Sequence, residues 1–155
     1  MPDNYEFDNI DLKILSLLQN NAKKPYTEVA KQAYVSSGTI HVRMNKLEKM
    51  GIVRGASLDL NLSKLGYTVG AFLGVFLAKS SLYEKVANQL EKIPEITSIH
   101  YTTGNYSMFV RIYAKSTDHL KDILHDKVQK VEGIERTETF IILEETLSRS
   151  IALES

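Results

Sequence analysis

The spacing of the hydrophobic residues changes once along the chain, and this change constrains the fold more than any other feature. Before residue 50, apolar residues recur at helical spacing, as Ile10, Ile14, Leu17 and Leu18 do. After residue 68, short apolar runs with a period near two alternate with amphipathic stretches. The chain is therefore predicted to be an α+β protein, with three helices followed by a βαββαβ segment.

The first part is predicted to be a three-helix winged helix-turn-helix. Its helices are expected over residues 8–21, 25–33 and 37–50. Asp8 and Ser36 stand where N-cap residues are expected, and Gly51 stands where a left-handed residue commonly follows a helix. A short strand and turn is predicted over residues 52–56.

The second part is predicted to be a ferredoxin-like βαββαβ sandwich, with helices on one face of an antiparallel sheet. Strands are expected at 68–78, 96–102, 106–114 and 134–143, and helices at 81–93 and 117–131. The two helices end in similar sequences, Lys92-Ile93-Pro94-Glu95-Ile96 and Lys130-Val131-Glu132-Gly133-Ile134. The expected boundaries are a first domain at 1–55, a linker at 56–67 and a second domain at 68–155, with 147–153 as a candidate edge strand.

The sheet of the second domain needs a cover on its second face. Six residues supply more apolar surface than two helices can bury: Phe72, Phe76, Ile99, Tyr101, Phe109 and Ile112. An apolar surface of this size predicts self-association through the sheet, as a two-fold homodimer. The strand at 68–78 is apolar on both faces, as expected for a strand buried at such an interface.

Composition excludes several classes of protein. The 155 residues include 19 basic and 19 acidic side chains, so bulk positive charge cannot drive nucleic-acid binding. The absence of cysteine excludes disulfides, thiolate metal sites and cysteine nucleophiles. No apolar run is long enough to span a bilayer, and the acidic N-terminus does not resemble a signal peptide. We expect a cytoplasmic protein that needs no cofactor.

Positive charge is concentrated locally. Residues 23–54 hold seven basic and two acidic side chains. On the third helix, a polar face lies opposite the buried stripe and follows a short helix and a tight turn, which is the arrangement of a helix-turn-helix DNA reader. Ser37, Thr39 and Val42 are predicted to face base edges, Arg43, Lys46, Lys49 and Arg54 to bind phosphates, and Ser36 and Gly38 to offer backbone N–H groups. A solvated basic face, and an intramolecular salt bridge for Arg43, are the alternatives.

Several motifs together resemble the leucine-responsive/asparagine-regulator (Lrp/AsnC) family of transcription factors. They are Asp8-x-x-Asp11-x-x-Ile14-Leu15, Glu28-Val29-Ala30, the run Thr39-Ile40-x-x-Arg43-Met44-x-x-Leu47-Glu48-x-x-Gly51-Ile52-Val53, Ile93-Pro94-Glu95-Ile96, Thr103-Gly104-Asn105-Tyr106 and Gly133-Ile134-x-x-Thr137-x-Thr139. Each motif is weak alone, but their order and spacing match from about residue 7 to 145.

The resemblance implies a one-component regulator that binds double-stranded DNA at a palindromic operator. It also implies a homodimer, commonly assembled further into octamers, that binds a small effector such as an amino acid between subunits. The effector residues implied are Thr103, Gly104, Asn105, Tyr106, Ser107, Thr137 and Thr139.

The chain departs from the family pattern in three places. Tyr34 stands where such a turn usually has glycine, and forcing a tyrosine to positive φ costs about 1–2 kcal/mol, so a different local turn is expected. Gly38 is a weak helix former inside the third helix. The effector loop usually reads Gly-Asp-x-Asp, whereas Asn105 and Ser107 stand here in place of both carboxylates.

Two other functions are alternatives to this interpretation. A small ferredoxin-fold hydrolase would need a nucleophile or a metal, and His119, Asp122 and Asp126 share one helix face at a spacing compatible with metal binding. These three residues are more simply explained as part of the solvent-exposed face of an amphipathic helix. The remaining alternative is an effector-sensing or scaffold protein without specific DNA binding, against which the basic helix face argues.

Overall fold

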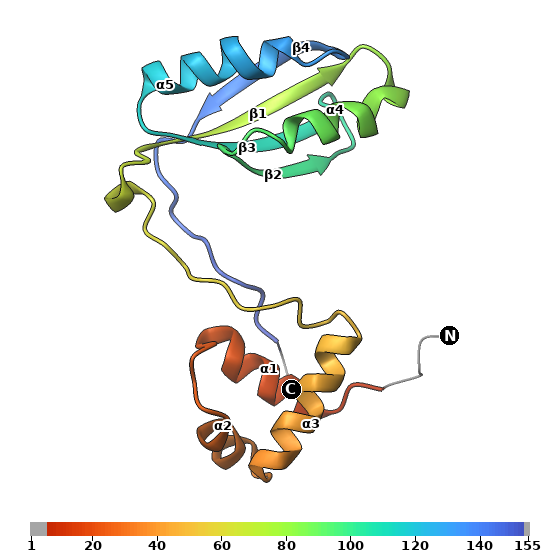
Figure 1. The fold of residues 1–155 in the computed structure, drawn as a ribbon, viewed down its shortest axis with the longest axis vertical. Coiled ribbons are helices and arrows are strands. Elements are labelled where there is room, and N and C mark those ends of the chain that lie inside the picture. Colours follow the sequence, from red (N-terminus) through yellow and green to blue (C-terminus); the bar gives the residue numbers. More distant parts are fainter. Residues whose placement is uncertain (1–5, 154–155) are drawn as a thin grey trace. The chain divides into compact units, whose positions relative to one another are not determined.

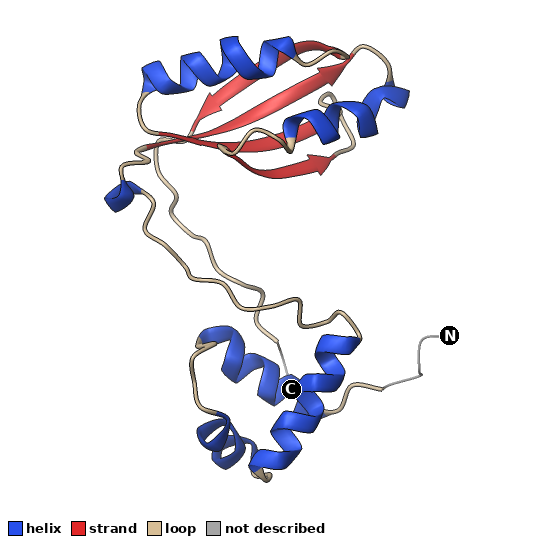
Figure 2. Ribbon diagram, viewed as in Figure 1, coloured by secondary structure: helices blue, strands red, loops and turns tan. Residues whose placement is uncertain are grey.

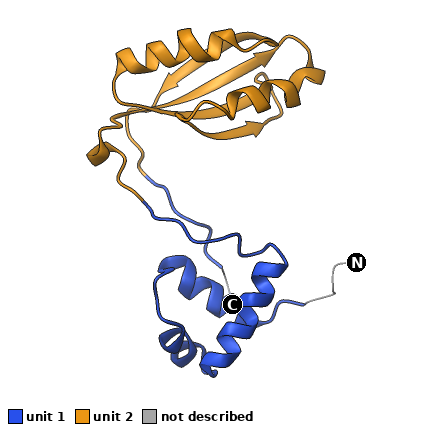
Figure 3. Ribbon diagram, viewed as in Figure 1, with its two compact units in different colours: residues 1–59, 147–155 blue, residues 60–146 orange. Residues whose placement is uncertain are grey.

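A computed structural model describes residues 6–153. The chain divides into two compact units (Figure 3), one made of residues 1–59 with 147–155 and the other of residues 60–146. In the described part of the chain, no helix is long and apolar enough to cross a membrane.

The first unit contains three helices, α1 (Asn9–Asn20), α2 (Tyr26–Ala33) and α3 (Ser37–Lys49), shown in Figure 1. They pack around a small core in which Ile14, Val29, Ile40 and Leu47 are fully buried. Each helix contributes residues at helical spacing, so the predicted amphipathic stripes are confirmed.

The predicted caps of these helices are also confirmed. Asp8 accepts a hydrogen bond from the backbone N–H of Asp11 at 2.9 Å, and the Asp11 carboxylate accepts one in return from the Asp8 N–H at 3.3 Å. Ser36 caps α3, and Gly51 follows α3 with a φ of 72°. These local hydrogen bonds fix where α1 and α3 begin.

Two predictions in or near this unit are wrong. Residues 52–56 form a turn and loop rather than a strand (Figure 2), although Ile52 and Val53 have high strand propensity. Residues 147–153 are extended chain without strand pairing, and they group with the first unit instead of adding an edge to the sheet. In both cases the described residues provide no neighbouring strand to complete a hydrogen-bonded ladder.

The second unit has the predicted ferredoxin-like topology. After a 3-10 turn, η1 (Ser63–Leu65), the elements are β1 (Val69–Leu77), η2 (Ser80–Leu82), α4 (Tyr83–Leu90), β2 (Ile96–Tyr101), β3 (Met108–Ala114), α5 (Thr117–Asp122), η3 (Ile123–Lys127), η4 (Val128–Lys130) and β4 (Ile134–Ile141). The four strands pair antiparallel in the order β2-β3-β1-β4. The predicted helix at 117–131 is therefore three segments, with a wide π turn at η3 between α5 and η4.

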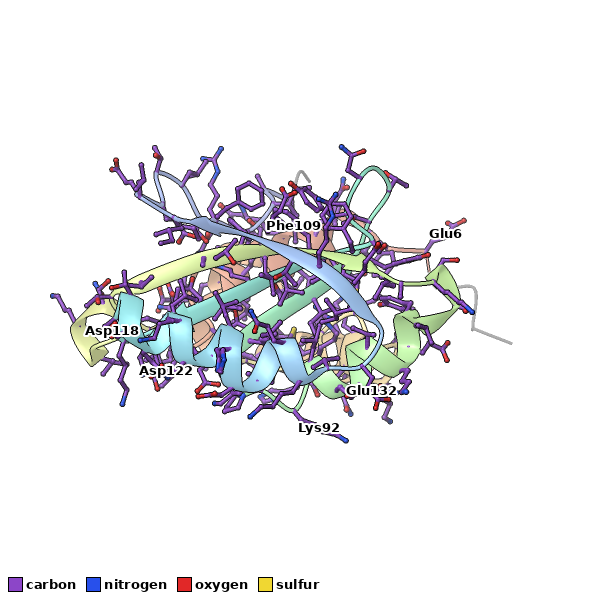
Figure 4. The ribbon with its side chains drawn as sticks, turned by 90° about the horizontal axis from the view of Figure 1, so that it is seen from above. Glu6, Lys92, Phe109, Asp118, Asp122 and Glu132 are labelled. Carbon is purple, nitrogen blue, oxygen red and sulfur yellow. The ribbon has the colours of Figure 1, made fainter. Side chains whose placement is uncertain are left out.

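Alternation along the central strands separates the two faces of this sheet. Leu73 and Val75 of β1 and Val110 and Ile112 of β3 are fully buried in the core formed with the helices. Helix α4 and the helical stretch from α5 to η4 lie on the same side of the sheet (Figure 4). The other side is called here the open face.

The open face carries aromatic rings from three strands. Phe72 of β1 stacks on Phe109 of β3 with ring centroids 5.2 Å apart, and Phe109 lies 6.3 Å from Phe140 of β4. Figure 4 labels Phe109 on the side of the sheet away from α5. Phe72, Phe76 and Phe109 therefore lie on the open face, as the sequence predicted.

The other three residues assigned to that face lie on the helix side. Ile112 is fully buried in the core and Ile99 packs against it. The Tyr101 ring lies 4.3 Å from the ring of Tyr83 in α4. The open face is thus narrower than the sequence suggested, but it remains aromatic.

Candidate nucleic-acid interface and ligand loop

Helix α3 presents a buried stripe and an exposed face. Ile40 and Leu47 are fully buried and Met44 nearly so, because these residues recur on one side of the helix. Val42 is 70% exposed on the opposite side, and Lys46 and Lys49 are exposed with it. An apolar residue this exposed beside two basic residues is suited to a thymine methyl and flanking phosphates.

The N-terminal turn of α3 is held by its own hydroxyl groups. The Ser36 Oγ accepts a hydrogen bond from the Thr39 N–H at 3.1 Å and lies 2.9 Å from the Thr39 Oγ1. A Cβ at Gly38 would meet only the Ser36 Oγ, at an ordinary 3.7 Å. Packing within the chain therefore does not require glycine at this position, whereas close approach of a ligand to the backbone would.

Arg43 has an intramolecular role in the structure. One Nη1 lies 2.7 Å from the Asp8 Oδ1 and 2.8 Å from the Asp11 Oδ1, so it joins α3 to the capped start of α1. The Arg43 hydrogen bond lowers the pKa of Asp8, and the two carboxylates raise the pKa of Arg43. The structure thus shows the intramolecular salt bridge that the sequence offered as the alternative for Arg43. We therefore do not propose a phosphate contact for this residue.

Tyr34 adopts a left-handed conformation, so the prediction of a different local turn is wrong. It follows α2 with φ 57° and ψ 41°, so the turn keeps a left-handed residue at this position. This conformation costs a tyrosine about 1–2 kcal/mol of conformational free energy. The side chain is 94% exposed. Its backbone N–H donates to the Lys31 carbonyl at 3.4 Å and closes the end of α2.

The loop between β2 and β3 is tightly closed. The Thr102 N–H donates to the Ser107 carbonyl at 3.1 Å, and the Thr102 hydroxyl donates to the Tyr106 carbonyl at 2.9 Å. Gly104 has a φ of 98°, which glycine adopts without strain. Asn105 is exposed at the tip of this loop.

Tyr106 anchors the loop to the open face. A Cβ built on Gly74 of β1 would lie only 2.5 Å from the Tyr106 ring, so glycine is required there. The Tyr106 hydroxyl donates to the Glu138 carboxylate at 2.6 Å, and this hydrogen bond raises the pKa of Tyr106. Its ring also lies 5.0 Å from Phe76.

The two threonines assigned to the same site lie elsewhere in the subunit. Thr137 pairs with Val75 and Thr139 with Leu73, and both partners point into the core. Paired residues of neighbouring strands share a face, so both threonines lie on the helix side of the sheet. Tyr106 lies on the open face, and one subunit therefore does not bring all the expected effector residues together.

The helical His/Asp spacing does not form a cluster. The described residues contain no group of three or more side chains that could hold a metal ion. His119 lies 3.5 Å from Glu95, whose carboxylate also binds the Lys127 Nζ at 2.7 Å. Burial is the largest single influence and raises the pKa of Glu95, but the hydrogen bond from Lys127, a backbone hydrogen bond and the nearby charges together outweigh it, so the net pKa is lowered.

Both units match known protein families. A family model described as winged helix-turn-helix DNA-binding matches residues 7–54, and one described as the Lrp/AsnC ligand binding domain matches residues 70–151. Regulatory protein AsnC of Escherichia coli K12 is 42% identical over 149 residues, which cover 96% of this chain and 98% of that protein. The chain belongs to the Lrp/AsnC family.

Other Lrp/AsnC members agree with this assignment. The transcriptional regulator FL11 of Pyrococcus furiosus is 38% identical and covers 88% of this chain and 89% of its own. The solved structure of E. coli AsnC superposes with a TM-score of 0.90 at 41% identity, covering 96% of this chain and 99% of that one. A feast or famine regulatory protein of Mycobacterium tuberculosis, solved with L-methionine, gives a TM-score of 0.89 at 25% identity, covering 96% and 100%.

Membership of the Lrp/AsnC family makes this chain a DNA-binding transcriptional regulator with a ligand-binding domain. The curated relatives are named as regulators, a non-enzymatic role, so the hydrolase alternative is set aside. The predicted family, fold class and function are confirmed.

Sequence reasoning missed one residue on the exposed face of α3. His41 is exposed beside Val42, and its ring lies edge-on to Tyr26 of α2 with centroids 4.7 Å apart. The sequence could have indicated this exposure, because His41 and Val42 both lie between the buried residues Ile40 and Met44. The contact between the His41 and Tyr26 rings joins α3 to α2.

Proposed function

We propose that α3 enters the major groove and reads an operator sequence. The exposed face of α3, with Val42 at its centre and lysines at its C-terminal half, is the observation that supports this proposal. Base-edge contacts are assigned to Ser37, Thr39 and Val42, as expected from the sequence. The half-buried Ser37 and Thr39 reach the groove only at the N-terminal end of the helix.

Phosphate contacts are assigned to Lys46, Lys49 and Arg54, with Ser36 and Gly38 contributing backbone N–H groups at the start of α3. Each cation that neutralises a phosphate makes binding more sensitive to salt. Arg43 is excluded from this set because Asp8 and Asp11 already bind it. Its ion pairs instead hold α3 against the start of α1.

We further propose that a second copy covers the open face, giving a two-fold dimer that presents two copies of α3 to a palindromic site. The aromatic rings of the open face support this assignment. So does Arg111, which lies over the Phe72 ring and whose buried Nε has no acceptor among the described residues. Octamers are an extension suggested by family membership. Sedimentation at micromolar concentration is the test, and a monomer would contradict it.

An amino-acid effector is proposed for the loop at Thr103–Ser107. The M. tuberculosis relative was solved with L-methionine, and the glycine at 104 lets a ligand approach the backbone. Thr137 and Thr139 join this site only if a different subunit supplies them, because in one chain they lie on the other face. Glu138 brings a carboxylate to the loop through Tyr106, which offers a partner for the ligand's ammonium group.

The experiment that tests this function is binding to a selected duplex. A random-sequence pool enriched by the wild-type protein yields the operator, and mobility shifts at low and high salt measure specific and non-specific affinity. Calorimetry against the twenty amino acids identifies an effector, and repeating the shift with that ligand measures coupling. Binding without sequence preference at any salt concentration would contradict the proposal. A regulator of chromosomal DNA is proposed to act in the cytoplasm.

A further inference from the structure

Tyr34 combines two properties that rarely occur together. Among the described residues it is the one non-glycine residue with a left-handed φ, 57°. It is also 94% exposed, with no side-chain hydrogen bond or ring contact within the part of the chain that the structure describes. Strained backbone conformations cluster at functional sites, so an exposed residue that carries one is a candidate for a role outside the fold.

The fold itself does not use this side chain. Glycine would adopt the same backbone conformation without strain, and asparagine would do so with less. Nothing packed in the first unit depends on the ring, since the core is built from Ile14, Val29, Ile40 and Leu47. The tyrosine therefore costs stability without adding a contact inside the chain.

The position of Tyr34 places it beside the reading helix. It lies two residues before Ser36, the N-cap of α3, so its Cα is within about 7.6 Å of the Ser36 Cα. A tyrosine side chain reaches about as far again, and its hydroxyl is a hydrogen-bond donor. If α3 occupies the major groove, as in the proposed function on which this inference rests, the ring would lie within reach of the DNA backbone that flanks the start of α3.

We propose that Tyr34 is a DNA-contacting residue whose hydroxyl donates a hydrogen bond to a phosphate oxygen next to the bases read by the N-terminal turn of α3. Phosphate oxygens accept such bonds from tyrosine, and these contacts fix the register of a reading helix. The contact is neutral on the protein side, so it adds affinity without releasing a counterion. The strained turn holds the tyrosine in place for this contact.

The test uses the full-length protein and the duplex that the wild type selects from a random-sequence pool. Tyr34→Phe removes only the hydroxyl and keeps the strain. Tyr34→Gly and Tyr34→Asn remove the ring and relieve the strain. Thermal unfolding, equilibrium affinity, the dependence of affinity on salt, and interference by ethylated phosphates are measured for each protein.

We expect Tyr34→Phe to bind about tenfold more weakly, with the same melting temperature and the same salt slope as the wild type. Tyr34→Gly and Tyr34→Asn should melt at higher temperature yet bind at least as weakly as Tyr34→Phe. At one phosphate per half-site, ethylation should inhibit the wild type but not Tyr34→Phe.

Three results would overturn the assignment. Wild-type affinity in all three variants would remove Tyr34 from the interface. Full affinity in Tyr34→Phe with losses in Tyr34→Gly and Tyr34→Asn would mean that the ring, not the hydroxyl, makes the contact. An ethylation pattern in Tyr34→Phe that matches the wild type would exclude a hydrogen bond from the Tyr34 hydroxyl to a phosphate. Each of these leaves DNA binding by α3 itself intact, so this inference fails separately from the function of the chain.

Discussion

The reading helix and the ligand loop differ in how much of each site one chain contains. All proposed base contacts lie on α3, and its caps, buried stripe and exposed face come from residues 36–51. The loop at 103–107 is instead anchored to the open face by Tyr106, while the two threonines assigned to it face the other way. A site on one helix is complete in the monomer, whereas a site built across a sheet face depends on how copies assemble.

The broadest expected effect, on both stability and dimerisation, comes from Gly74→Ala, which disrupts the anchoring of the loop by Tyr106. The new Cβ would meet the Tyr106 ring at 2.5 Å, and that ring is held between its neighbours on the open face. We expect a loss of about 1–3 kcal/mol in stability, together with a weaker dimer. Gly70→Ala on the same strand is the matched control, because its Cβ would meet the flexible end of Ile142 at 3.3 Å. Equal effects in both variants by unfolding and sedimentation would contradict the special role of Gly74.

Arg43→Met tests the support behind α3. The change leaves the buried Asp11 without its Arg43 partner, and we expect a loss of about 2–3 kcal/mol, because Arg43 is itself only partly buried. DNA affinity should fall while the dependence of log affinity on log salt stays the same. A salt slope reduced by about one unit would instead return Arg43 to the phosphate contacts. Chemical unfolding and mobility shifts measure both quantities.

Asn105→Asp tests whether the loop binds the effector, because it introduces the carboxylate that the family pattern usually has at this position. A charge-assisted hydrogen bond to an ammonium group contributes about 1.5–3 kcal/mol, so the affinity for an amino acid should rise about tenfold or more. Calorimetry with the amino acid that binds the wild type measures the change. Unchanged affinity, with the ligand mapped to another place, would remove this loop from the effector site.

Lys46→Ala is expected to weaken binding to all sequences similarly and to reduce the salt slope by about one unit. The matched control is Lys92→Ala, an exposed lysine in the second unit, labelled in Figure 4, which should change nothing. A slope that falls equally in both variants would show that general charge, rather than the α3 face, controls binding.

The smallest effect concerns acid stability. The Arg43 hydrogen bond lowers the pKa of Asp8 in the folded protein, so the unfolded state binds the proton more readily. The contribution of Asp8 to stability is present above the unfolded pKa and is lost as the pH falls below about 4. Asp8→Asn should flatten the decline of melting temperature in that range. An unchanged decline would mean that other carboxylates govern it.

Sequence reasoning succeeded where a feature depends on neighbouring residues. The caps at Asp8 and Ser36 and the left-handed Gly51 follow from local hydrogen bonding, and the ferredoxin-like order follows from the change of hydrophobic period. The partners of Arg43, in contrast, lie 35 and 32 residues earlier in the chain. Residues 52–56 form no strand because the described part of the chain offers no neighbouring strand to pair with them. Neither is encoded locally.

One error was avoidable. The prediction that Phe109 and Ile112 share one face of the sheet conflicts with strand alternation, because residues three apart in a strand point to opposite faces. The left-handed Tyr34 was not avoidable in this way, because the preference of the whole turn outweighed the preference of the residue. The ligand loop is the part of the site least predictable from the sequence, since it depends on which face Tyr106 contacts.

Directed cleavage of DNA from α3 tests the central claim most directly. The chain has no cysteine, so Val42→Cys introduces a single thiol that can carry an iron chelate, with Asp118→Cys on α5 as the control. The account predicts two symmetric clusters of cuts in the major groove of the selected duplex, separated by one helical turn of about 10 base pairs or a multiple of it, and no comparable cuts from position 118. Weak or unlocalised cuts from position 42, equal to those from position 118, would contradict it.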